Sequence, residues 1–384
     1  MRKIILVVLI TIIILIILAG ITINAVVGDS GLIYQARNSK EMSSNEIAET
    51  EENMNKVMTE YANMMAEDSE IPVVDIPTTV EEGKESGKSF DNTTIIKDDL
   101  DNDVTIPGGF HIAEDSGTKV EEGIVIEDDT GNQFVWIPVG TYQTTSGEKN
   151  NNLSRRSWAN KDIVAEPIEI DVDNIIMYEL ISYYGEENSN SVAKDTIETF
   201  KVSSNSNKGF YIGRYEAGTE VERTSAGDSL TTPLVQTNKN AYVWVTRDQA
   251  KTQAETMYSG DEFVTSELIS SYAWDTALNF ICQTNEEGYL LATTTDNVYG
   301  NIGTSIKELT GAYEADNYSN IHDFLGNSHE WTTEYSSDSY RPNVARGGFA
   351  NENNDHRYCA GGRYAGTIND CNQDASFRVQ LYIK

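Results

Sequence analysis

Cysteine and histidine are the residue types that could most readily bind a metal ion or attack a substrate in this chain. The three cysteines, Cys282, Cys359 and Cys371, form no Cys-x-x-Cys pair, and the four histidines are scattered. Their spacing predicts no zinc site. Three cysteines are also too few for a disulfide framework, and an odd number leaves at least one unpaired within an exported chain.

Other ionisable residues have plainer interpretations than catalysis. His356 lies between Asp355 and Arg357 and could act as a general acid or base, but in so turn-rich a stretch we expect a solvated imidazole. Glu216 and Asp275 could be imagined as a carboxylate pair. We expect them instead to be buried hydrogen-bond acceptors.

The stretch from Ala350 to Ala375 has an unusual composition. It contains no Lys, Met or Trp, only one Glu and one Gln, and many Asn, Asp, Tyr and Gly residues. Changing the adenines of an AAC codon can give Asn, Asp, His, Tyr, Ser, Thr, Cys or Gly, among others, but never Lys, Met, Trp, Glu or Gln. Paired glycines at Gly347-Gly348 and Gly361-Gly362 supply turns, and apolar runs flank the stretch. This pattern predicts a scaffold that presents a polar surface loop, where binding function concentrates.

Tyr and Asn suit a binding surface because they offer rigid amphipathic area and adaptable hydrogen bonding. We therefore expect ligand contacts at Asn351, Asn353, Asn354, Asp355, His356, Tyr358, Tyr364, Ile368, Asn369, Asp370 and Asn372.

The overall charge limits the class of partner. The 384 residues carry a formal net charge of -33 and a pI near 4.3, whereas nucleic-acid binding needs a basic surface. The charge fits a solvated extracellular surface. We expect a protein or carbohydrate ligand and no nucleic acid.

The first 33 residues are predicted to form a transmembrane anchor. Ile4 to Ala19 is apolar except for Thr11, and the hydrophobic character continues to about Val27, which is long enough to span a bilayer. Arg2 and Lys3 precede it, so the N-terminus is expected in the cytoplasm and the acidic bulk on the extracellular face of a bacterial cell. A cleaved signal peptide and a buried soluble helix are the alternatives.

The rest of the chain divides by composition. Residues 34–66 have helical spacing and predict a stalk, with an irregular stalk as the alternative. Residues 67–105 are acidic, with Gly, Ser, Thr and Pro, and predict a flexible linker. Residues 106–384 form the globular part.

The globular part is predicted to be an α+β domain. Strands are expected at 123–126, 134–139 and 209–216, with an insertion over 140–207. A capping box at Thr246-Arg247-Asp248-Gln249 begins one helix, and a second helix is expected to start at Thr265. We expect Trp136, Trp244, Trp274 and Trp331 to pack in the core.

Five motifs resemble those of the formylglycine-generating (sulfatase-modifying factor) family. They are Gly326-Asn327-Ser328-His329-Glu330-Trp331, Arg346-Gly347-Gly348-Phe349, Ser376-Phe377-Arg378-Val379, Gly209-Phe210-Tyr211-Ile212-Gly213-Arg214-Tyr215-Glu216 and Tyr272-Ala273-Trp274-Asp275. The resemblance implies a variant of the C-type lectin fold over roughly Ile106 to Lys384.

The same resemblance bears on activity. Enzymes of that family oxidise a substrate cysteine with two active-site cysteines that bind copper and follow the Arg-Gly-Gly element. Here residues 350–357 contain no cysteine, and Cys359 and Cys371 lie further on. We therefore expect no copper and no formylglycine-generating activity.

The resemblance also implies a calcium ion. Asp323, Gly326, Ser328 and Glu330 match family positions that bind calcium, which prefers such oxygen ligands. The expected role of the ion is structural. The alternative is that Glu330 caps a tight turn and Asp323 is solvated.

Two further resemblances concern the ends of the chain. The compositional bias over about 346–379 resembles the variable region of diversity-generating retroelement target proteins, many of which use this lectin-type fold. The first helix resembles those of type IV pilin-like proteins. The leading hypothesis is a non-catalytic, surface-anchored ligand-binding protein with a diversifiable face. The alternatives are an oxidase-like enzyme on the same fold and a pilin-like structural subunit.

Overall fold

The computed structural model describes residues 76–156, 158, 169–172, 175–179, 189–313, 315–336, 338–351 and 359–384. The predicted anchor, stalk and first part of the linker lie outside this range. Among the described residues, no helix has the length and apolar character needed to cross a membrane. Residues 76–384 form one compact unit by themselves.

Residues 76–105 are folded, so the flexible-linker prediction is wrong for this part of the chain. They form helix α4 (Val80–Ser86) and strands β1 (Thr94–Lys97) and β2 (Asp103–Ile106). Val80, Phe90, Ile96 and Val104 are all buried. These four apolar residues join the core of the domain, which is enough to fold this acidic stretch.

The first six-stranded sheet is antiparallel and carries much of the core. Its order is β13-β20-β10-β5-β4-β3. The strands are β3 (Phe110–Ile112), β4 (Val125–Asp128), β5 (Gln133–Pro138), β10 (Gly209–Gly213), β13 (Val264–Leu268) and β20 (Val379–Ile383). The predictions of strands at β4, β5 and β10 are confirmed.

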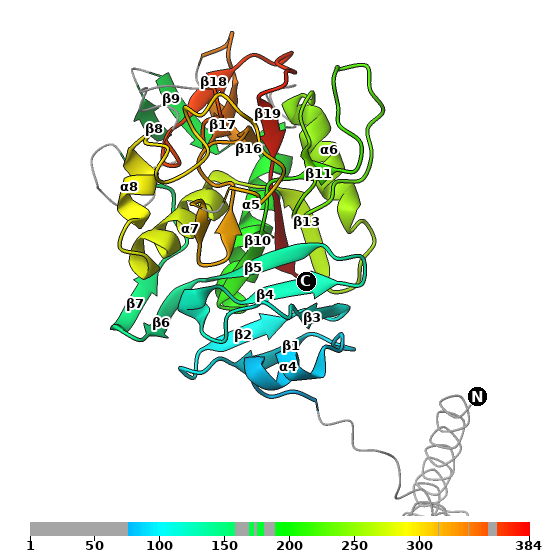
Figure 1. The fold of residues 1–384 in the computed structure, drawn as a ribbon, viewed down its shortest axis with the longest axis vertical. Helices are drawn as coiled ribbons and strands as arrows, with labels where there is room; N and C mark the ends of the chain where they lie inside the picture. Colours follow the sequence, from blue (N-terminus) through cyan, green and yellow to red (C-terminus); the bar gives the residue numbers. More distant parts are fainter. Residues whose placement is uncertain are drawn as a thin grey trace, which may run out of the picture. The chain divides into compact units, whose positions relative to one another are not determined.

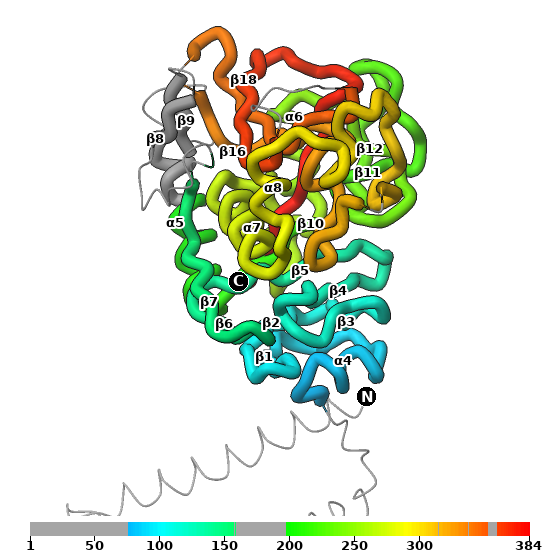
Figure 2. Tube along the Cα trace, turned by 60° about the vertical axis from the view of Figure 1, so that its left-hand side comes forward, coloured from blue at the N-terminus to red at the C-terminus, as the bar shows by residue number. Residues whose placement is uncertain are grey.

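The second sheet contains the segment predicted to bind ligand. Its path is β18-β17-β16-β9-β8, and β19 pairs in parallel with β16. Its strands are β8 (Glu169–Val172), β9 (Ile175–Glu179), β16 (His329–Ser336), β17 (Asn343–Arg346), β18 (Tyr364–Gly366) and β19 (Ala375–Phe377). Figures 1 and 2 place β16 and β18 at the end of this unit opposite α4 and β1.

Short hairpins and helices complete the unit. The two-stranded pairs are β6 (Gly140–Thr144) with β7 (Gly147–Asn151), β11 (Gly218–Thr219) with β12 (Asn240–Ala241), and β14 (Asn317–Tyr318) with β15 (Ile321–His322). The helices are η2 (Val120–Glu122), α5 (Ser189–Ser206), α6 (Arg247–Met257), α7 (Ser271–Thr284) and α8 (Gly288–Thr293). The predicted α+β class is confirmed; the finer lectin-type fold stays a prediction.

The two predicted helices have different outcomes. Thr246 caps α6 as expected, with its side chain accepting from the Gln249 amide. The second helix does not start at Thr265. Residues 264–268 are strand β13, and α7 begins after Ser270, whose hydroxyl accepts from the Ala273 amide.

A buried carboxyl in the first sheet should make stability depend on pH. Glu267 accepts hydrogen bonds from Gln380 and Tyr382, and burial raises the pKa of Glu267 from 4.5 to about 7. The folded state therefore binds this proton more tightly than the unfolded state. The stability contributed is complete below pH 4.5 and is lost as the pH rises to about 7.

We expect the free energy of unfolding to fall by up to about 3 kcal/mol more across this pH range in the native chain than in Glu267→Gln, at about 1.4 kcal/mol per pKa unit. Urea unfolding at a series of pH values measures this. Glu262→Gln changes an exposed carboxylate nearby and is the control. Equal slopes in the native chain and Glu267→Gln would contradict the prediction.

Candidate functional site

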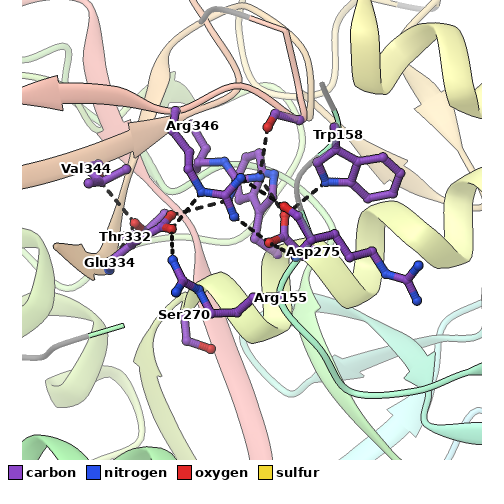
Figure 3. A network of polar contacts seen from close by, with 12 residues as sticks. Arg155, Trp158, Ser270, Asp275, Thr332, Glu334, Val344 and Arg346 are labelled. Atoms are coloured by element: carbon purple, nitrogen blue, oxygen red, sulfur yellow. Dashed lines mark hydrogen bonds and ion pairs between the residues drawn. The ribbon is translucent and has the colours of Figure 1, made fainter. Parts of the chain in front are cut away.

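A buried ion network lies beneath the segment predicted to bind ligand. We define it as Arg155, Arg346, Arg363, Asp275 and Glu334. Each of these side chains is at most 2% exposed. Arg346 ends β17, Arg363 immediately precedes β18, Glu334 lies on β16 and Asp275 on α7. The network therefore joins the second sheet to the helix beside it (Figure 3).

The contacts of Asp275 are close and numerous. Its Oδ1 accepts from Arg346 Nη2 at 2.7 Å and from Trp158 Nε1 at 3.1 Å. Its Oδ2 accepts from Arg363 Nη2 at 2.6 Å and from the Arg156 amide at 2.9 Å. The prediction that Asp275 is a buried hydrogen-bond acceptor is confirmed.

Glu334 is the second carboxylate of the network. Its Oε1 accepts from Arg363 Nε at 2.7 Å and from Arg155, and its Oε2 lies 3.4 Å from Arg346 Nη1. Burial alone would raise the pKa of both carboxyls. The surrounding guanidinium groups outweigh burial, so the pKa of Asp275 falls to about 2 and that of Glu334 is lowered. Both are therefore ionised at neutral pH, as partners of fixed cations rather than proton donors.

A second buried group surrounds Arg378, the single residue between β19 and β20. Its guanidinium binds Glu330 through Nη2 at 2.6 Å and Nε at 2.9 Å. It also donates to the carbonyl oxygens of Gly213, His322 and Asp323. Glu216 is also fully buried, and its carboxylate accepts a hydrogen bond from the Asn327 side-chain amide. The prediction that Glu216 is a buried hydrogen-bond acceptor is confirmed.

The two side chains matched to a calcium site, those of Glu330 and Asp323, already have protein partners in this structure. Both oxygens of Glu330 already face Arg378, and Asp323 Oδ2 accepts from the Gly311 amide at 2.8 Å. The Ser328 hydroxyl is buried without a hydrogen-bond partner. Among the described residues, no three His, Cys, Asp or Glu side chains are grouped so that they could hold a metal ion. Calcium stays a prediction from the resemblance and enters none of the arguments below.

The cysteines are poorly suited to redox chemistry. Among the described residues none of the three forms a disulfide, and Cys359 is buried a few residues before β18. Burial raises the pKa of Cys359 to about 11 and that of Cys282 to about 12, and it also raises the pKa of Cys371. Since the thiolate is the nucleophile and the metal ligand, these thiols are in the less reactive form at neutral pH.

The predicted contact residues do not all play the same part. Asn351, Asn369 and Asn372 are exposed. Asp370 is half-buried and accepts from the amide and hydroxyl of Thr367 at 2.8 and 2.7 Å, so it closes its own turn. Ile368 and Tyr364 are half-buried, with Tyr364 stacked on His329 at 5.1 Å between ring centroids. Asn353, Asn354, Asp355, His356 and Tyr358 lie outside the described residues.

A groove that the sequence did not predict has the exposed Asn351 in its lining. Its volume is about 530 Å³, and we call it the Trp244 groove. Trp136, Trp274 and Trp331 are fully buried as expected, but the core prediction is wrong for Trp244, which is half-buried and lines this groove. The other lining residues are Glu222, Arg223, Thr224, Asn240, Ala241, Val243, Ser305, Lys307, Glu308, Leu309, Ala350, Asn351, Gln373 and Asp374.

Comparisons with known proteins give distant likenesses. No protein-family model matches the chain, and no curated protein matches it. Among solved structures, it is similar to variable protein 1 of Treponema denticola, with 14% identity, a TM-score of 0.33, and coverage of 46% of this chain and 85% of that one. It is also similar to PvdO from Pseudomonas aeruginosa, with 12% identity, a TM-score of 0.36, and coverage of 67% and 97%. A structure of CarF matches with 12% identity, a TM-score of 0.32, and coverage of 65% and 98%. These likenesses assign no family to the chain.

Proposed function

We propose that this chain is a non-catalytic binding protein that displays a diversifiable, C-type-lectin-like face outside a bacterial cell, held there by its N-terminal hydrophobic segment. The observation that carries the proposal is the contrast within the second sheet. Asn351, Asn369 and Asn372 are exposed. By contrast, Arg346 at the end of β17 and Arg363 just before β18 are buried and ion-paired. Side chains on the exposed turns can therefore change without disturbing the packing beneath.

The chemistry of the thiols supports binding over oxidation. Burial raises the pKa of Cys359 and Cys282 well above neutral, whereas a copper-dependent oxidase needs thiolates that share one ion. The ligand is a protein or a carbohydrate in this proposal. The amino-acid composition of the 350–375 stretch, which resembles the outcome of adenine changes in AAC codons, supports diversification of the face by a retroelement.

Two libraries of the full-length chain test the proposal. One randomises Asn351, Asn369 and Asn372, and the other randomises the buried residues Val344, Ala345 and Ala375. Both libraries are displayed, and resistance to protease measures the fraction of folded members. The folded members are then selected for binding to lysozyme, which serves as a test protein. We expect most of the surface library to fold, because exposed substitutions usually change stability by no more than about 0.5 kcal/mol, and we expect it to yield binders.

The buried library should lose most of its folded members, since core substitutions leave cavities or overpack. If the surface library unfolds as often as the buried one, or folds and yields no binder, the proposed function is wrong. Conversion of a cysteine-containing sulfatase peptide with copper and oxygen would also contradict it.

A further inference from the structure

The backbone of Trp244 is held in an uncommon conformation at the centre of the groove. Its φ is 57°, a left-handed value that is rare and strained for a bulky residue. The Trp244 amide donates to the Asn372 carbonyl at 2.9 Å. Arg223 donates to the carbonyls of Val243 and Trp244 at 2.9 and 2.8 Å. These contacts hold the Trp244 backbone on both sides, and they join it to Asn372, an exposed residue of the predicted variable segment.

The positive charges near the groove are already engaged. Arg223 is only 4% exposed and donates to four backbone carbonyl oxygens. Lys307 is half-buried, and its ammonium donates to the Gln373 carbonyl. Both cations therefore serve to hold the walls of the groove together.

The negative charges are turned toward solvent. Glu222 and Glu308 are exposed and Asp374 is half-buried, and all three line the groove. The lining offered to a ligand thus combines Trp244 and three carboxylates with the two cations, whose donor groups are already bound to carbonyl oxygens. The face of a tryptophan ring attracts a cation, and the carboxylates add charge complementarity.

We propose that the Trp244 groove binds one cationic side chain, arginine or lysine, of a protein partner. This inference rests on the proposed function and names the chemistry of its ligand. The groove supplies an anchor for a basic residue outside the predicted variable segment. Asn351, which lines the groove, and Asn372, whose carbonyl binds the Trp244 amide, adjust the fit to the rest of the partner. A volume of about 530 Å³ lies within the usual range of ligand pockets, about 300–1,000 Å³.

Two blocked tripeptides, glycyl-arginyl-glycine and its citrulline counterpart, provide the test. Citrulline keeps the shape of arginine and removes its charge. Calorimetric titration of the full-length chain at low and at physiological salt should show the arginine peptide binding at least about tenfold more tightly, a difference of about 1.4 kcal/mol. The preference should weaken as salt screens the exposed carboxylates.

Matched variants identify the groove as the site. Trp244→Gly removes the ring and suits the positive φ, so the backbone bonds can remain. Glu222→Gln combined with Glu308→Gln removes two exposed charges. Both variants should lose the preference for the arginine peptide. Tyr340→Ala and Glu262→Gln, exposed residues outside the groove, should retain it.

The outcomes separate this inference from the proposed function. Equal binding of the two peptides, or binding that survives Trp244→Gly, overturns the cationic anchor. Binding of methyl mannoside that requires Trp244, without binding of the arginine peptide, overturns it in favour of a carbohydrate site. No binding of any probe also overturns it, whereas the proposed function depends separately on the surface library.

Discussion

Replacing Asp275 by asparagine should lower the free energy of unfolding by about 3–5 kcal/mol, the usual effect of removing one partner of a buried ion pair. The substitution keeps the size of the side chain but removes a charge that faces Arg346 and Arg363. It also turns an acceptor oxygen into a donor amide within reach of N–H groups. Since most domains are stable by about 5–15 kcal/mol, urea unfolding should show a large fall in the midpoint.

The controls separate loss of the network from a general effect of the substitution. Asp101→Asn alters an exposed ion pair with Lys97 and should leave the midpoint nearly unchanged. Adding Arg363→Gln to Asp275→Asn should cost less than the sum of the two single changes, because the residues share one network. A midpoint for Asp275→Asn that matches the native chain would mean that the network does not hold the second sheet.

Replacing Gly326 by alanine should be still more harmful, at about 4 kcal/mol or more, which is exceptional for a single substitution. Gly326 has a φ of 90°, and an added Cβ would lie 2.1 Å from the Asn301 carbonyl oxygen. Its amide donates to the Gly347 carbonyl at 2.6 Å. The added Cβ would clash with a backbone atom of Asn301, so no side-chain rotation can relieve the contact. The hydrogen bond from Gly326 to Gly347 also restrains any shift of the Gly326 backbone.

Gly109→Ala is the matched control for Gly326→Ala. Gly109 has a similar φ of 84°, but nothing lies within 4 Å of an added Cβ. Its substitution should therefore cost only the conformational term, about 1–2 kcal/mol. Thermal or urea unfolding of both variants measures the difference. Equal losses would mean that strain at φ, rather than the contact with Asn301, makes glycine necessary.

Local patterns predicted the elements whose partners are close in sequence. The adjacent strands predicted at 123–126 and 134–139 and the capping box at Thr246 need only partners close in sequence, and both predictions are confirmed. The sequence predicts that residues 265–268 begin a helix, because Leu268 and Ile269 fit helical spacing. They form β13 because they pair with β20, more than a hundred residues away. Long-range pairing of this kind leaves no local signal.

The candidate site also has a part that local sequence predicted and a part that depends on distant segments. The turn-rich composition after Gly347 predicted the exposed positions of Asn351, Asn369 and Asn372. The Trp244 groove combines segments near residues 222, 244, 307 and 373, and no spacing in the sequence relates them. The fold of residues 76–105 was not predicted either, because it also depends on contacts between distant segments. The apolar residues of this stretch are sparse locally but are buried by strands from elsewhere in the domain.

The position of β20 has a consequence for how the chain folds. Strand β20 lies between β10 and β13 in the first sheet. Strand β19, which a single residue separates from β20, pairs with β16 in the second sheet. Residues 347–374 thus connect β17 to β19, and β18 pairs with β17 within this span. The loops before and after β18 are each joined to fixed strands at both ends. The entropy lost in closing such a loop depends on its length far more than on its polar side chains. Chains that carry different residues there should share one refolding rate while differing in what they recognise.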